Sequence, residues 1–173
     1  MITKDKLSNI KLLLLDVDGV LTDGTITYCD SGEQIKSFNS KDGLGLRLLM
    51  DSGVQVGIVT GRTSMALKHR CDNIGITLLF DGIKEKSKIL STIESRTKIP
   101  AEHMAYVGDD LIDLPIMKKV GLSFCVADAS DEVKDHADIV TEKNGGKGAV
   151  REICEMILKS KGKWETILNR YLL

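Results

Sequence analysis

The sequence comprises 173 residues with 24 Lys and Arg against 25 Asp and Glu, and its formal net charge is -1. This length suits one domain with a sizeable core, and the near-neutral balance gives no electrostatic reason to expect nucleic acid or an anionic membrane as a partner. No apolar run reaches the roughly 20 residues that cross a bilayer, and the N-terminus lacks a signal-peptide pattern. Four cysteines without CxxC spacing offer no zinc or redox motif. We expect a single domain over residues 1–173 and a cytoplasmic location.

After Lys11, an apolar run over 12–15 leads directly into Asp16, Val17, Asp18 and Gly19. A continuous apolar run is typical of a strand that is buried on both faces of a parallel sheet. Ligands of open α/β sheets bind beyond the carboxyl ends of the strands, so the two carboxylates fall where chemistry is expected. A surface turn would explain the Asp-Val-Asp pattern about equally well. The rest of the chain has to decide between the two interpretations.

A β-hairpin is predicted over about 24–38, because two alternating strands flank a turn in which Gly32 supplies a positive φ. A lone hairpin is marginally stable in water, so we expect it to pack against something. A polar loop over 39–43 should then lead into a helix that ends at Gly53.

The remaining chain alternates between strands and helices. We expect strands over 54–59, 77–80, 104–107, 122–126 and 139–140, helices up to Gly75, over 84–96, up to Val120, over 130–136 and over 149–159, and a tail over about 161–173 that is apolar on one face. This alternation indicates βαβ units and an α/β, three-layer, Rossmann-like domain with a parallel sheet. The insert after the first strand is only large enough to be a hairpin flap, so we expect no second domain.

Polar residues follow three of these strands: Asp16 and Asp18, then Thr60, then Asp109 and Asp110 with Asp113 a turn further on. Parallel strands bring such residues to one edge of the sheet. Crowded carboxylates repel one another unless a cation lies among them, and a set of oxygen ligands suits Mg²⁺. Thr60 adds a hydroxyl near a helix start, where phosphate binds readily, and Lys86 can supply a further positive charge.

These motifs, in this order, resemble the haloacid dehalogenase superfamily of phosphohydrolases. The hairpin in place of a cap and four further segments look like its capless members that act on 3-deoxy-D-manno-octulosonate 8-phosphate in lipopolysaccharide biosynthesis. These segments lie at 41–43, 60–62, 108–113 and 145–152. Lys147 is a mild departure, because Arg is more usual there. The resemblance implies a Mg²⁺-dependent phosphatase that assembles as a homotetramer with its hairpins at the subunit interfaces.

The resemblance also implies a role for each motif residue, and each role agrees with the chemistry of the side chain. Asp16 is expected to attack phosphorus and form an aspartyl-phosphate, while Asp18 protonates the leaving oxygen and then activates water. Asp16, the Asp18 backbone carbonyl and Asp109 would hold the metal ion. Thr60 and Lys86 would hold phosphate oxygens, with Asp110 and Asp113 tuning the metal or orienting Lys86 from behind.

A further set of residues is expected to contact the sugar acid. The candidates are Asp18, Asn39, Ser40, Lys41, Asp42, Gly43, Arg47, Arg62, Arg70 and Lys86. Arg62 is the preferred partner of the sugar carboxylate, because an arginine fork binds a carboxylate with two hydrogen bonds. Arg47, Arg62 and Arg70 could each also be ordinary surface arginines. The loop over 145–148 is either a linker or a mobile closing segment.

Three alternative functions remain open from the sequence. A phosphatase for a sialic-acid-type 9-phosphate would carry the same motifs. A phosphoacceptor receiver domain needs its acceptor aspartate on a later strand, where this chain has Thr60. A non-catalytic regulatory module is disfavoured because Asp16, Asp18 and Lys86 are all intact.

Overall fold

The computed structural model describes residues 4–172. Within this range six parallel strands form one sheet in the order β5-β4-β1-β6-β7-β8. Their bounds are Leu12–Leu15 for β1, Gln55–Val59 for β4, Leu78–Phe80 for β5, Met104–Gly108 for β6, Leu122–Cys125 for β7 and Ile139–Val140 for β8. The α/β class and the parallel sheet predicted from the sequence are confirmed.

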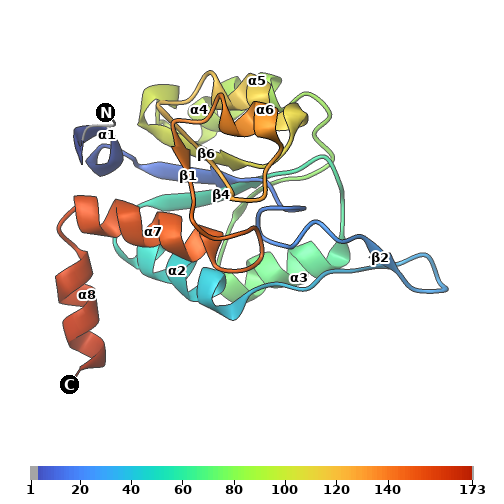
Figure 1. The fold of residues 1–173 in the computed structure, drawn as a ribbon, viewed down its shortest axis with the longest axis horizontal. Coiled ribbons are helices and arrows are strands. Elements are labelled where there is room, and N and C mark those ends of the chain that lie inside the picture. Colours follow the sequence, from blue (N-terminus) through green and yellow to red (C-terminus); the bar gives the residue numbers. More distant parts are fainter. Residues whose placement is uncertain (1–3, 173) are drawn as a thin grey trace.

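Helices cover both faces of this sheet, which makes three layers (Figure 1). One face carries α2 (Ser40–Asp51), α3 (Met65–Ile74) and α7 (Ala149–Ser160), and the other carries α4 (Leu90–Thr97), α5 (Leu114–Met117) and α6 (Asp131–Lys134). The short helix α1 (Lys4–Ser8) packs beside α7, and α8 (Trp164–Tyr171) runs from the end of α7 away from the sheet. Among the described residues, no helix has both the length and the apolar character needed to cross a membrane.

The central strand β1 is buried because both of its faces are covered. All four of its leucines have no exposed surface, and Leu12 pairs with Gln55 on one side and with Met104 on the other. Burying a leucine side chain stabilises a fold by about 1.5–3 kcal/mol. The hydrophobic core therefore fixes the direction and register of the strand whose end carries Asp16.

Two predicted boundaries were wrong. The segment over 39–43 is not a loop, because α2 begins at Ser40. The Asn39 side chain accepts the backbone N–H groups of Lys41 at 2.8 Å and Asp42 at 3.4 Å, which is an N-cap. The helix expected over 84–96 is divided into a 3₁₀ turn at Lys86–Lys88 and α4, and the first turn buries the Lys86 side chain.

The predicted hairpin is present but short, with β2 (Thr27–Tyr28) antiparallel to β3 (Gln34–Ile35). Gly32 has a φ of +83° in its turn. The hairpin projects from the body of the molecule beyond α3 (Figure 1), and Tyr28 and Ile35 are 56% and 54% exposed. The sequence analysis expected it to pack against another surface, and within the described chain β3 contacts α3 while Tyr28 and Ile35 stay exposed.

The loop over 145–148 packs against the residues that follow β1, and its role as a linker or as a closing segment stays a prediction. The N–H of Gly146 donates to Val20 O at 2.9 Å, and the N–H of Gly145 donates to the Asp128 carboxylate at 2.8 Å. A Cβ atom on Gly145 would lie 1.6 Å from Gly19 O, so only glycine allows this approach.

Candidate active site

The site lies where β1 ends and the chain turns sharply. Asp16 continues the ladder by donating its N–H to Val107 O at 3.0 Å, and its side chain is almost fully buried. The chain then turns at Gly19, which has a φ of +88°. A Cβ atom there would lie 2.0 Å from Asp109 Oδ2, so glycine lets the loop after β1 meet the loop after β6.

A pocket of about 250 Å³ opens at this edge of the sheet. It is lined by Asp16, Asp18, Gly24, Ile26, Thr60, Gly61, Arg62, Asp109, Asp110 and Ile112. These residues follow three different strands, so the structure brings together the three polar strand ends found in the sequence. The pocket is mainly acidic at its base, with Arg62 on its wall.

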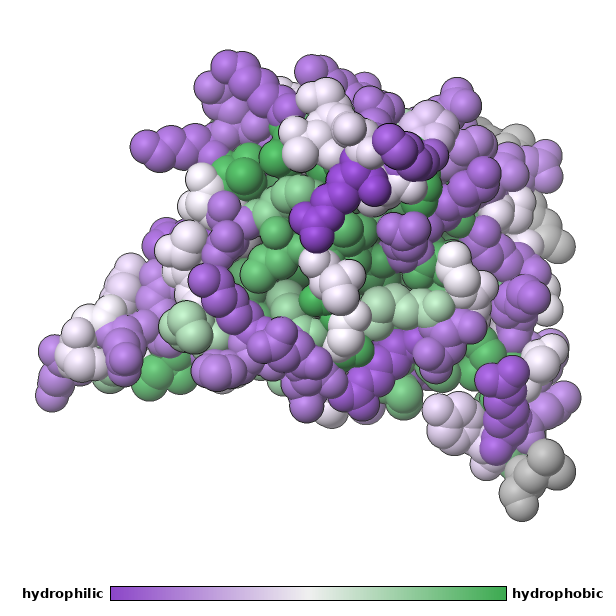
Figure 2. All heavy atoms as spheres, turned by 180° about the vertical axis from the view of Figure 1, so that it is seen from behind, coloured by the Kyte–Doolittle hydropathy of each residue, from purple (hydrophilic) through white to green (hydrophobic). Residues whose placement is uncertain are grey.

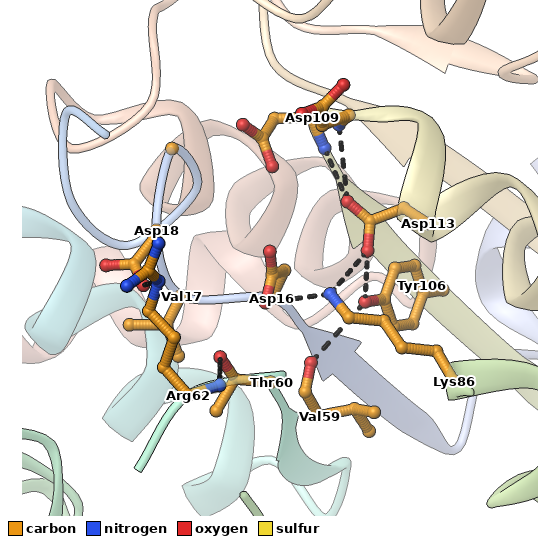
Figure 3. A network of polar contacts seen from close by, with 12 residues as sticks. Asp16, Val17, Asp18, Val59, Thr60, Arg62, Lys86, Tyr106, Asp109 and Asp113 are labelled. Carbon is orange, nitrogen blue, oxygen red and sulfur yellow. Dashed lines mark hydrogen bonds and ion pairs between the residues drawn. The ribbon is translucent and has the colours of Figure 1, made fainter. Parts of the chain in front are cut away.

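Lys86 is the buried cation of the site. Its Nζ atom lies 2.9 Å from Asp16 Oδ1 and 2.6 Å from Asp113 Oδ1, and its side chain is 1% exposed (Figure 3). Burial disfavours the charged ammonium, but Asp16 and Asp113 outweigh this effect and raise the pKa of Lys86. The lysine is therefore a fixed positive charge beside the Asp16 carboxylate.

Asp113 is held by four donors. Its Oδ1 accepts the Lys86 ammonium and the Tyr106 hydroxyl at 2.6 and 2.7 Å, and its Oδ2 accepts the backbone N–H groups of Asp109 and Asp110 at 3.0 and 3.3 Å. Oxygen atoms of Asp16, Asp109 and Asp113 lie within 4.8 Å of one another. Because the Asp113 oxygens are already engaged, Asp16 and Asp109 are the two carboxylates left to bind a cation.

The carboxylates of Asp16 and Asp109 are suited to bind a divalent cation. Burial raises the pKa of Asp16 to about 6, against the opposing charge of Lys86. Burial, together with the charges of Asp113 and Asp16, raises the pKa of Asp109 to about 8. Carboxylates crowded in this way hold protons unless a cation neutralises them, and an all-oxygen set is the type of ligand that Mg²⁺ prefers.

Asp18 lies across the pocket from this cluster and pairs with two cations. Its Oδ1 accepts the ammonium of Lys36, and its Oδ2 lies 3.6 Å from Arg62 Nε. Thr60, at the end of β4, is 3% exposed, and its Oγ1 accepts the N–H of Arg62 at 3.5 Å. Asp16 and Asp18 therefore meet different partners, as their alternation along the chain suggests.

The other candidate sugar contacts do not line this pocket. Arg47 and Arg70 each donate to backbone carbonyl groups, of Asn73 at 2.6 Å and of Asn39 at 3.0 Å. The Asp42 carboxylate is buried and accepts the Arg151 N–H at 2.7 Å. For the sugar contacts at 39–43 and at the two arginines, substrate binding stays a prediction.

The sequence analysis missed two residues of the site. Tyr106 is a polar residue in an otherwise apolar strand, three positions before Asp109, and this position was a usable signal. Lys36 gave no signal, because hairpin alternation assigns it to a face without saying what covers that face.

The fold and the acidic site are those of a haloacid dehalogenase-like hydrolase, and the model of that family matches residues 79–153. The 3-deoxy-D-manno-octulosonate 8-phosphate phosphatase KdsC of Escherichia coli K12 is 48% identical over 158 residues, covering 91% of this chain and 84% of that protein. The chain belongs to this phosphatase family within the haloacid dehalogenase-like hydrolases.

Solved structures agree with this assignment. The crystal structure of 3-deoxy-D-manno-octulosonate 8-phosphate phosphatase from Yersinia pestis has a TM-score of 0.92 and 43% identity, covering 94% of this chain and 88% of that one. The enzyme from Moraxella catarrhalis, solved with a magnesium ion, a phosphate ion and a KDO molecule, has a TM-score of 0.94 and 37% identity, covering 97% of each chain.

Proposed function

We propose that this protein is a Mg²⁺-dependent phosphatase that hydrolyses 3-deoxy-D-manno-octulosonate 8-phosphate to the free sugar acid and phosphate. The observation that carries the proposal is the buried Lys86 ammonium, 2.9 Å from Asp16 and anchored by Asp113 in an acidic pocket. The 48% identity to the Escherichia coli phosphatase supports the substrate. In that role the protein serves lipopolysaccharide biosynthesis.

In the first step Asp16 attacks phosphorus. A bond forms between an Asp16 carboxylate oxygen and phosphorus, the bond from phosphorus to the sugar oxygen breaks, and Asp18 gives its proton to that oxygen. Lys86 and Thr60 hold phosphate oxygens while the charge redistributes, since electrostatic positioning dominates phosphoryl transfer.

In the second step Asp18 accepts a proton from water, the water oxygen bonds to phosphorus, and the bond to Asp16 breaks. Inorganic phosphate leaves and both aspartates return to their starting states. These proton transfers need Asp18 near the leaving oxygen and away from Lys86. The position of Asp18, across the pocket from Lys86, supports this separation of the proton donor from the phosphate-binding cation.

The acidic cluster would hold Mg²⁺ through Asp16, Asp109 and the backbone carbonyl of Asp18. Bound there, the ion supplies positive charge that neutralises the phosphoryl oxygens and orients them. Asp113 keeps Lys86 in place, and Asp110 caps the next turn through a 2.7 Å bond to the Leu111 N–H.

Arg62 is the arginine that lines the pocket, and its side chain is 51% exposed. An ulosonic acid has a carboxylate far from its phosphate, and the Mg²⁺ site and Lys86 already serve the phosphate end. Arg62 is therefore the residue we assign to the carboxylate. A sialic-acid-type 9-phosphate would present the same groups one carbon further apart.

The test is a phosphate-release assay with Mg²⁺ on the 8- and 9-phosphates of ulosonic acids, with EDTA and a neutral hexose phosphate as controls. Release that is fastest from 3-deoxy-D-manno-octulosonate 8-phosphate and is abolished by EDTA supports the proposal. A preference for the 9-phosphate would transfer the assignment to the alternative substrate. Full activity in EDTA would reject the metal mechanism.

We further propose that residues 1–173 act as a single domain and assemble into a homotetramer through their hairpins. Support comes from the uncovered apolar side chains of the hairpin, Tyr28 and Ile35. In addition, hydrophobic residues gather in the middle of the face seen in Figure 2. Light scattering at micromolar concentration should give four chains, and a fully active monomer would contradict this. The cytoplasmic location stays a prediction.

A further inference from the structure

Lys36 is an unusual lysine, because its side chain is 3% exposed although it follows the exposed hairpin strand β3. A buried ammonium carries a large desolvation penalty unless an acceptor meets it. Among the described residues, Asp18 Oδ1 is the side-chain acceptor that Lys36 finds, in a hydrogen bond that spans 18 positions of the chain. The fold therefore joins the hairpin directly to the carboxylate proposed to transfer protons.

Lys36 reaches Asp18 without itself lining the pocket. Asp18 and Arg62 line the pocket, and Lys36 is not among the lining residues. The two carboxylate oxygens are thereby distinguished, with Oδ1 bound to Lys36 and Oδ2 lying 3.6 Å from Arg62 on the pocket wall. A charge-assisted hydrogen bond of this kind fixes orientation as well as distance.

We infer that Lys36 is a positioning residue for Asp18, which holds Oδ1 so that Oδ2 meets the leaving oxygen and the attacking water. The inference rests on the proposed function only in giving Asp18 the proton transfers. Lys36 itself exchanges no proton. The Lys36 contact makes the geometry of the proton-transfer step depend on the position of the hairpin.

The test compares Lys36→Met, which keeps the length but removes the charge, with Lys36→Arg, which keeps the charge. The matched control is Lys161→Met, a half-buried lysine that donates to Ser8 O at 2.6 Å at the opposite edge of the sheet. Single-turnover rates are measured on p-nitrophenyl phosphate, whose leaving group needs no proton, and on phenyl phosphate, whose leaving group does. The sugar phosphate is a third substrate.

Lys36→Met should slow phenyl phosphate and the sugar phosphate by about 10-fold to 100-fold, because small misplacements of a catalytic group cost rates of this size. The rate on p-nitrophenyl phosphate should stay within about two-fold of wild type. Lys36→Arg should lose less than Lys36→Met, and Lys161→Met should match wild type on all three substrates.

An equal loss on both aryl phosphates would overturn the inference, because it would mean that Lys36 serves the phosphate or the fold. Unchanged rates on phenyl phosphate would overturn it too. The two aryl substrates make this result independent of the sugar. A wild-type enzyme that releases no phosphate from the sugar substrate would overturn the proposed function and leave the aryl comparison valid.

Discussion

The Lys86 ammonium lies 2.6 Å from Asp113 Oδ1, and the two side chains are 1% and 0% exposed. The pair joins the turn before α4 to the turn after β6. Removing one partner of a buried pair leaves an uncompensated charge, which is far more costly than losing a neutral hydrogen bond. Asp113 is thus expected to matter for both folding and turnover, although it does not line the pocket.

Asp113→Asn tests this expectation. The variant keeps the shape of the side chain but loses the charge that faces Lys86, so the free energy of unfolding should fall by about 3 kcal/mol and kcat by about 10-fold or more. Tyr106→Phe is the matched control, since it removes one neutral hydrogen bond to the same oxygen and should cost about 1 kcal/mol. Denaturant titration and steady-state rates measure both. Equal losses in the two variants would show that the charge of Asp113 is not the cause.

Arg62→Ala tests the assignment of the sugar carboxylate. Losing a hydrogen-bond partner of a charged group typically costs ~1.5–3 kcal/mol, so kcat/KM for the ulosonate phosphate should fall by roughly one to two decades. A neutral aryl phosphate should hardly be affected. A parallel fall for both substrates would mean that Arg62 serves the phosphate or the fold.

Metal-free protein should lose stability as pH rises. Burial raises the pKa values of Asp16 and Asp109 to about 6 and about 8, from 3.8 for an ordinary aspartate, so the folded state holds protons that the unfolded state releases. The free energy of unfolding should therefore fall between about pH 4 and about pH 8. Mg²⁺ should raise Tm more at pH 8 than at pH 5. Thermal melts in EDTA and in Mg²⁺ measure the difference, and a Mg²⁺ effect that shrinks with rising pH would contradict this account.

Gly146→Ala tests whether the loop over 145–148 shapes the site. Gly146 has a φ of +63°, and a Cβ atom there would lie 2.5 Å from the Thr22 backbone carbon. Gly75→Ala is the matched control, since Gly75 has a φ of +92° and nothing within 4 Å of its added Cβ. Both variants should lose about 1–2 kcal/mol from backbone strain. Only Gly146→Ala should also lower kcat, because the loop after β1 that carries Asp18 must shift. Equal rates in the two variants would mean that the loop has no influence on the site.

The sequence was sufficient for the sheet and for the acidic cluster, because both depend on local patterns. An apolar run that ends in carboxylates specifies a buried strand and the chemistry at its end, as β1 with Asp16 shows. The start of α2 was missed because Asn39 suits a turn as well as an N-cap. Tyr106 left a signal as a polar residue in an apolar strand, but its pairing with Asp113 did not. Lys36 meets Asp18 only when separate elements pack, so no local pattern could reveal that pair.

The most direct test of the central claim is the turnover of Asp16→Asn on 3-deoxy-D-manno-octulosonate 8-phosphate with saturating Mg²⁺. The amide has nearly the size of the carboxylate but cannot attack phosphorus, so the folded variant should release no phosphate above background while wild type turns over. Circular dichroism and the melting transition establish that the variant is folded. Phosphate release near the wild-type rate from folded Asp16→Asn would contradict the mechanism.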